Sequence, residues 1–140
     1  MSADFAEDQK RFMALARQTV DVWNPAQAGR YIDHLREEAD ETRTAWAEGD
    51  ATKTVDGLVD SIVVALGALL SLGVDPVEAW GAVHRANMSK VDGSLGETVW
   101  RSDGQVGKPH GWVGPEAALE RLIRNIQQDT QLQIERCRVP

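Results

Sequence analysis

The 140-residue chain is poor in cysteine and in aromatic residues, and it lacks the patterns of β-strands. Its one cysteine, Cys137, excludes an internal disulfide and a cysteine zinc site, and it fits a reducing cytoplasm. The longest apolar run, residues 61–74, is shorter than the roughly 20 residues of a membrane-spanning helix. The N-terminal residues are acidic and polar, unlike a secretory signal. We therefore expect one cytoplasmic domain, residues 1–140, that does not associate with membranes.

The chain has fewer basic than acidic residues, and the difference is concentrated in one segment. The formal net charge is −7, which excludes the basic footprint of a general nucleic-acid binder. Residues 1–32 carry four acids and four bases and are neutral, whereas residues 33–60 carry nine acids and three bases. A concentration of acids in 28 residues indicates either a solvated face or a metal site.

Helical periodicity dominates the rest of the chain. Apolar residues recur at helical spacing over residues 4–22. Asn24, with proline at the next position, predicts the cap of a second helix that runs to about residue 48 and stops at Gly49. Asp50 predicts the start of a third helix ending at Gly73. Further helices are expected over residues 75–88 and 116–135. The fold class is therefore all-α, a bundle of four or five helices.

Two features of this bundle are unusual. Residues 91–115 hold six of the twelve glycines and show no periodicity, which predicts a long glycine-rich loop before the last helix. The third helix is apolar on nearly all sides, and a chain of this size has little room to bury such a helix. We therefore expect a homodimer or a dimer of dimers. Trp46 and Trp80 are expected to be packing residues.

Five acids point to a divalent cation. Glu37, Glu38 and Glu41 share one face of the second helix, where like charges destabilise it unless something compensates. Asp56 and Asp60 share a face of the third helix, and Asp60 is followed directly by an apolar stretch. A carboxylate in such a stretch is rarely buried without a partner or a metal. Two antiparallel helices would bring the two sets of acids together.

Basic residues follow these acids along the chain. Arg85, Lys90, Arg101 and Lys108 lie in or beside the predicted loop. Acids that hold a cation, with bases nearby, suit a polyphosphate ligand whose charge both can neutralise. The sequence has no Gly-x-x-x-x-Gly-Lys-Ser/Thr loop and no Gly-x-Gly-x-x-Gly motif, so a glycine cradle does not hold the phosphates.

Four segments, in this order, resemble a known family. They are Glu37-Glu38-x-x-Glu41, the helix that continues from Asp60 as Ser-Ile-Val-Val-Ala-Leu-Gly, residues 83–90 ending in Asn87-Met-Ser-Lys90, and Lys108-Pro-His-Gly-Trp112. The chain is similar to the all-α nucleoside triphosphate pyrophosphohydrolases. Within them it resembles the MazG-like and dUTPase-like members related to phosphoribosyl-ATP pyrophosphohydrolase.

The resemblance implies Mg²⁺-dependent hydrolysis of a nucleoside triphosphate at the α–β bond, with Mn²⁺ as a substitute metal and nucleotide-pool housekeeping as the role. It assigns the metal to Glu37, Glu38, Glu41 and Asp60, and the attacking water to Glu38. Asn87, Lys90 and Lys108 match residues that contact the sugar and phosphates. One position departs from the family pattern. Gly57 stands where an acid is common, and Asp56 is the expected substitute.

The base that is recognised is left open by the sequence. Trp23, Asn24, Tyr31 and His34 lie near the start of the acidic helix and could contact a base, although a helix cap and core packing equally suit Asn24 and Trp23. Two other interpretations compete with the enzyme. One is a non-catalytic helical module that binds a metal or a nucleotide, and the other is an interaction protein whose long loop contacts a partner.

Overall fold

The structure, a computed structural model, describes residues 4–137 and contains five α-helices in that range. They are α1 (Phe5–Leu15), α2 (Pro25–Ala47), α3 (Ala51–Ser71), α4 (Pro76–Met88) and α5 (Glu116–Cys137). No β-strand occurs among residues 4–137, so the all-α class is confirmed. The chain divides into two compact units, Met1–Pro76 with Ile126–Pro140, and Val77–Asn125.

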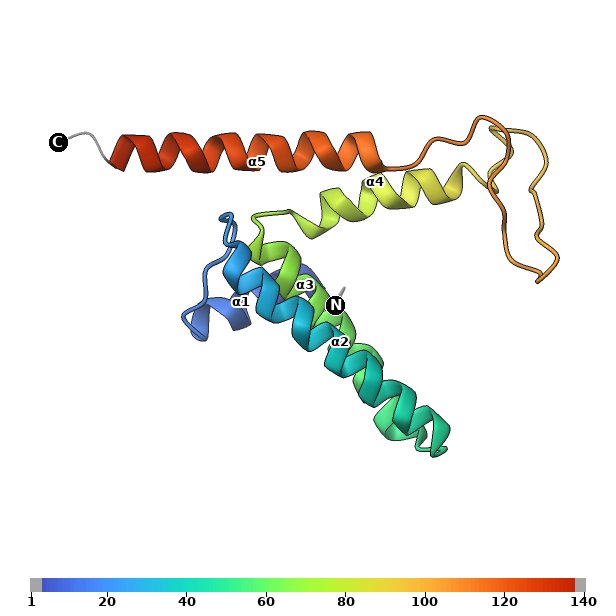
Figure 1. Ribbon diagram of the computed structural model, residues 1–140, viewed down its shortest axis with the longest axis horizontal. Coiled ribbons are helices and arrows are strands. Elements are labelled where there is room, and N and C mark those ends of the chain that lie inside the picture. The colour runs from blue at the N-terminus through green and yellow to red at the C-terminus, as the bar shows by residue number, and fades with distance from the viewer. Residues whose placement is uncertain (1–3, 138–140) are drawn as a thin grey trace. The chain divides into compact units, whose positions relative to one another are not determined.

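The first unit is built on a hairpin of two long helices, α2 and α3, which lie side by side (Figure 1). The side chain of Asn24 accepts a hydrogen bond from the backbone N–H of Gln27 at 3.1 Å, which confirms the predicted cap of α2. Gly49 adopts a φ of 75°, a conformation that favours glycine, and ends the helix as expected.

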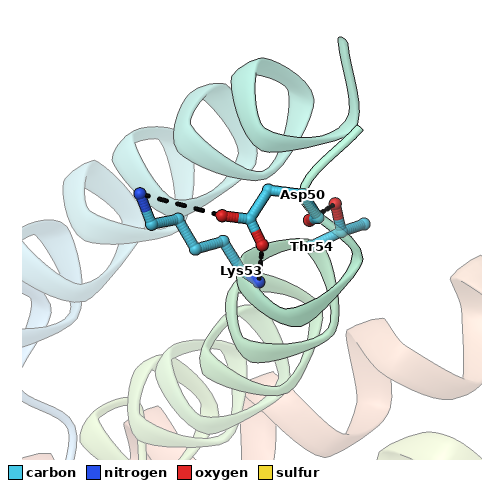
Figure 2. A network of polar contacts seen from close by, with 3 residues as sticks. All are labelled: Asp50, Lys53 and Thr54. Atoms are coloured by element: carbon cyan, nitrogen blue, oxygen red, sulfur yellow. Dashed lines mark hydrogen bonds and ion pairs between the residues drawn. The ribbon is translucent and has the colours of Figure 1, made fainter. Parts of the chain in front are cut away.

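A single residue, Asp50, starts α3 after the turn (Figure 2). Its carboxylate accepts the backbone N–H of Lys53 at 3.0 Å, and its backbone carbonyl accepts the Thr54 hydroxyl at 2.7 Å. The Lys53 ammonium lies 3.9 Å from the same carboxylate. The turn between α2 and α3 is therefore fixed by local bonds that the sequence makes predictable.

The first helix is shorter than its apolar periodicity predicts. It ends at Leu15, and the expectation of a helix to residue 22 is wrong. Arg17 and Asp21 have positive φ values of 59° and 57°, which a continuous helix does not allow. Bonds from distant residues hold this segment. The Gln27 side chain bonds both backbone groups of Thr19, and the N–H of Asp21 donates to the carbonyl of Leu70 at 3.1 Å.

Much of the apolar surface of the first unit stays exposed. On α3, Val55, Leu58, Val59 and Ile62 are each more than half exposed.

Trp46 and Trp80 are 73% and 71% exposed, so their expected role as packing residues is wrong. By length and composition alone α3 is apolar enough to cross a membrane, contrary to the expectation from the run 61–74. The core helix of a water-soluble protein passes the same test, and Asp56 and Asp60 lie on this helix.

The second unit contains most of α4, the connecting segment and the start of α5. The connection has no helix between residues 89 and 115. It is nevertheless internally bonded. Trp100 and Val106 form an antiparallel bridge, and the indole N–H of Trp112 donates to the carbonyl of Ala86 at 2.7 Å. Trp112 thus ties the far end of the loop to α4.

Candidate active site

The hairpin of α2 and α3 carries all five candidate metal-binding acids. Glu37, Glu38 and Glu41 lie on α2, and Asp56 and Asp60 lie on α3. The two helices approach closely beside these acids. A Cβ atom added to Gly57 would lie 3.3 Å from the Cβ of Thr42 and nearer still to its hydroxyl. A side chain at residue 57 would meet the Thr42 side chain, which would have to shift, so close helix packing explains the glycine, and the acid of α3 stands at Asp56 instead.

Glu38 is the electrostatic centre of this group. The pKa of Glu38 is raised above its ordinary value, mainly because its carboxylate has lost part of its contact with water. The negative charge of Asp60 is the second largest cause. The charges of Glu41, Asp56 and Glu37 raise this pKa further. The strongest of these charge effects comes from Asp60, on the opposite helix. The structure therefore brings the acids of the two helices into each other's electrostatic range.

No lysine or arginine compensates this charge within residues 4–137. The ion pairs formed there join Lys10 to Asp21, Lys53 to Asp50, Arg101 to Asp103 and His34 to Glu37. Four of the five acids, Glu38, Glu41, Asp56 and Asp60, are in none of these pairs. Uncompensated like charges oppose folding, so their presence favours a role that needs the charge.

The fit of these acids to a metal rests on their chemistry. Carboxylate oxygens are the ligands that Mg²⁺ takes in proteins. Within the described range no three His, Cys, Asp or Glu side chains are gathered closely enough to form a finished metal-ligand set. The donor types and the missing counter-charge therefore suit a hard divalent cation, while the side chains are not drawn together around one point.

His34 lies one turn before these acids on α2. Its Nδ1 is 3.1 Å from the Oε2 of Glu37, and both side chains are mostly exposed. His34 also lines a cavity of about 370 Å³ between α1, α2 and α3. It therefore connects the acidic face to a pocket on the same unit.

Trp23 and Asn24 have clear structural tasks. The backbone of Trp23 forms an antiparallel bridge with Leu72, at the end of α3. Asn24 caps α2 through its side-chain oxygen, while its amide nitrogen donates to the Thr19 hydroxyl at 2.9 Å. These bonds occupy the side-chain groups of Asn24 that would otherwise contact a base. Tyr31 is better placed than Asn24 to contact a base, because Tyr31 lines the same cavity as His34.

The candidate phosphate-binding residues gather in the second unit. The Lys90 ammonium donates to the side-chain oxygen of Asn87 at 2.8 Å. The ammonium groups of Lys90 and Lys108 each lie 4.7 Å from the centroid of the Trp112 ring. Attraction to the electron-rich ring face offsets part of the repulsion between the two cations. The Trp112 ring therefore contacts both of these lysines.

Sequence reasoning missed one residue of the cavity. Gln9 of α1 is 6% exposed, and its side chain lies beside the Tyr31 hydroxyl, whose pKa is raised by burial and lowered in part by hydrogen bonding to Gln9. No motif marks it, because an isolated glutamine on an amphipathic helix is ordinary. Its signal is tertiary, the burial of a glutamine amide beside the hydroxyl of Tyr31 on the neighbouring helix.

Comparison with known proteins agrees with this arrangement. The family model of phosphoribosyl-ATP pyrophosphohydrolase matches residues 9–87, which is more than half of the chain. The match covers all five acids and Asn87, whereas Lys90 and Lys108 lie beyond it. No curated protein sequence gives a significant match. The family name is that of a pyrophosphohydrolase, an enzyme that hydrolyses a phosphoric anhydride, and the resemblance inferred from the motifs is confirmed. The chain belongs to the phosphoribosyl-ATP pyrophosphohydrolase family.

Proposed function

We propose that this protein is a Mg²⁺-dependent nucleoside triphosphate pyrophosphohydrolase, which cleaves the α–β bond to give a monophosphate and pyrophosphate. One observation carries the proposal. Glu38 lies among four other carboxylates that raise its pKa, and no lysine or arginine in the described part of the chain pairs with it. Such crowding is costly for folding and useful for binding a hard cation.

Glu37, Glu38, Glu41, Asp56 and Asp60 would hold the metal. When bound, Mg²⁺ would supply positive charge that neutralises the phosphate oxygens, and Mn²⁺ would serve in its place. Glu38 orients the attacking water and accepts its proton, a task that suits a carboxylate placed at the centre of the acids. Positioning and electrostatics account for the rate, and no covalent intermediate is needed.

Asn87, Lys90 and Lys108 would bind the phosphates and the sugar. Charge-assisted bonds from an ammonium to a phosphate oxygen are stronger than bonds between neutral groups. The ring of Trp112 limits where the two ammonium groups can lie, so less side-chain entropy is lost when the anion binds. Trp112 is thus a positioning residue in this proposal.

The exposed apolar side chains of α3 also support self-association. A contiguous apolar surface of this kind on a small protein commonly marks an interface. We infer a homodimer or a dimer of dimers that covers Val55, Val59 and Ile62, while the acids on the hairpin remain open to substrate. The cytoplasm is the compartment that this proposal expects.

The decisive experiment is hydrolysis of a panel of ribo- and deoxyribonucleoside triphosphates with MgCl₂, with the products separated by ion exchange. Monophosphate and pyrophosphate are the expected products, and phosphoribosyl-ATP is included as an alternative substrate. Glu38→Gln keeps the size of the side chain and removes its charge, so turnover should fall by about 100-fold or more. Glu48→Gln, which changes the exposed C-cap residue that follows α2, is the matched control and should retain turnover. Diphosphate and inorganic phosphate as products, or full activity of Glu38→Gln, would contradict the proposal.

A further inference from the structure

A polar cavity lies between α4 and the first half of α5, which run beside each other in the second unit (Figure 1). Its volume is about 270 Å³, slightly below the usual range for sites that hold drug-sized molecules. The polar side chains that line it are Glu78, Arg85, Arg121 and Asn125. This size and this lining suit a small anion better than they suit a nucleoside.

Two arginines from different helices meet at this cavity. Arg85 comes from α4 and Arg121 from α5, and both are exposed, so a solute can reach them. Neither guanidinium takes part in an ion pair or a hydrogen bond with any residue between 4 and 137. Two cations that line one small cavity repel each other, and an anion held between them would offset that repulsion.

The backbone of α4 leaves room for the Arg85 guanidinium. A Cβ atom added to Gly81, one turn earlier, would lie 3.2 Å from the Nη1 atom of Arg85. The guanidinium is therefore folded back along the helix instead of extending into water. Glycine at residue 81 costs helix stability relative to alanine, and the space that it leaves is beside the Arg85 guanidinium.

Asn125 and Glu78 complete the polar lining. Arg121 and Asn125 are four residues apart on α5, so they share a face, and the side-chain amide of Asn125 adds a neutral donor. Glu78 contributes a negative charge, but it forms no ion pair with either arginine in the described chain. Two guanidinium groups against one carboxylate leave the cavity with an excess of positive charge.

This cavity is separate from the residues proposed to bind the substrate. Asn87 follows Arg85 by two residues on α4, which is a rotation of about 200° and places it on nearly the opposite side of the helix. Lys90 bonds to Asn87 and contacts Trp112, and none of these three residues lines the cavity.

We propose that the cavity between α4 and α5 is a second anion site, which binds an inorganic phosphate group either as free phosphate or as pyrophosphate. Arg85 and Arg121 donate charge-assisted bonds to its oxygens, and Asn125 donates from its amide. The inference goes beyond the proposed hydrolysis and does not depend on it, since binding alone is at issue.

The test follows the arginines directly. Protein labelled with ¹⁵N is titrated with sodium pyrophosphate, sodium phosphate or AMP, without metal and at constant ionic strength, and the arginine Nε–H signals are recorded by NMR. Arg121→Gln removes one of the two cations. Arg124→Gln, which changes an exposed arginine of α5 outside the cavity, is the matched control. Glu78→Gln removes the carboxylate of the lining.

Pyrophosphate should shift the signals of Arg85 and Arg121 and leave the signal of Arg124 in place. Arg121→Gln should weaken the binding that is followed at Arg85 by roughly 10-fold or more, because a charge-assisted bond is lost, and Arg124→Gln should change it by less than about twofold. Glu78→Gln should strengthen the binding by about two- to fivefold, because it removes a repulsive charge. A gain of affinity cannot come from a damaged fold, so this variant is informative even if Arg121→Gln is unstable.

Three results would each overturn the inference: equal shifts of Arg124 and Arg121, unchanged binding in Arg121→Gln, or weaker binding in Glu78→Gln. A stronger response to AMP than to pyrophosphate would overturn it as well, because a nucleoside does not suit a cavity of this size. Lys108→Ala should leave the shifts of Arg85 and Arg121 in place, and their loss would show that the cavity belongs to the substrate site. Failure of the wild-type protein to hydrolyse any triphosphate would contradict the proposed function alone.

Discussion

A single methyl group added at Gly67 should loosen α3 from α2, although alanine is the better helix former. The Cβ atom of an alanine at 67 would lie 2.5 Å from the Cζ and 2.6 Å from the Cδ1 of Tyr31. Carbon atoms in contact prefer about 3.5–4.0 Å, so the ring must move by about 1 Å. The ring cannot move freely, since its hydroxyl is bonded to Gln18.

The two opposing effects have known sizes. Alanine stabilises a helix interior by about 1 kcal/mol relative to glycine. Forcing a methyl group into a packed contact costs about 1–3 kcal/mol, and here loss of the Tyr31–Gln18 bond adds about 1 kcal/mol. Gly67→Ala should therefore lower the free energy of unfolding by about 1–3 kcal/mol. Gly29→Ala is the matched control, because nothing lies within 4 Å of its added Cβ, and it should gain about 0.5–1 kcal/mol.

Urea unfolding at one fixed protein concentration measures both changes, because self-association makes stability depend on concentration. The two variants should differ by about 1.5–4 kcal/mol, or roughly 6–16 °C in Tm for a chain of this size. Tyr31→Leu removes the ring that the methyl meets, so Gly67→Ala should cost less in that background. Equal stability of Gly67→Ala and Gly29→Ala would refute the assigned contact.

The remaining predictions concern charge and assembly. Glu38→Gln should raise the Tm of the metal-free protein above pH 5. Because the pKa of Glu38 is raised by folding, the folded wild-type protein binds more protons than the unfolded chain, and its stability falls as the pH rises from the ordinary pKa through the raised one. A lower Tm of the variant would contradict this. Lys108→Ala should raise KM more than it lowers kcat in steady-state assays, and the reverse would show that the lysine acts in the transition state. Trp112→Leu should raise KM as well, because both lysines lose the ring, and an unchanged KM would remove its positioning role. Ile62→Glu should reduce the mass measured by light scattering to that of one chain, whereas a wild-type protein that is already monomeric would exclude the proposed interface.

The fold could be predicted where local chemistry decides it. The capping and turn bonds of Asn24, Gly49 and Asp50 reach residues no more than five positions away, although the Asn24 N–H also donates to Ser71, and all three residues behave as their types suggest. The end of α1 could not be predicted in this way. It depends on the reach of Gln27 to Thr19 across eight residues, and on a backbone bond between Asp21 and Leu70.

The candidate site, like the fold, could be predicted only where local helix geometry decides it. Helical spacing alone placed the acids on shared faces of two helices, and hairpin geometry brings Asp60 near Glu38. Spacing could not explain Gly57, whose reason is the hydroxyl of Thr42 on the neighbouring helix. Nor could it find Gln9, whose neighbours are known only once three helices are assembled.

The hairpin of α2 and α3 also has a kinetic consequence. Glu38 and Asp60 are only 22 residues apart in the chain, and the turn between their helices is closed by bonds around Asp50. Contacts between residues close in sequence require little loop closure, so they form early and quickly during folding. On the proposed function, Mg²⁺ bound between these acids would stabilise this quickly closing hairpin as well as support turnover.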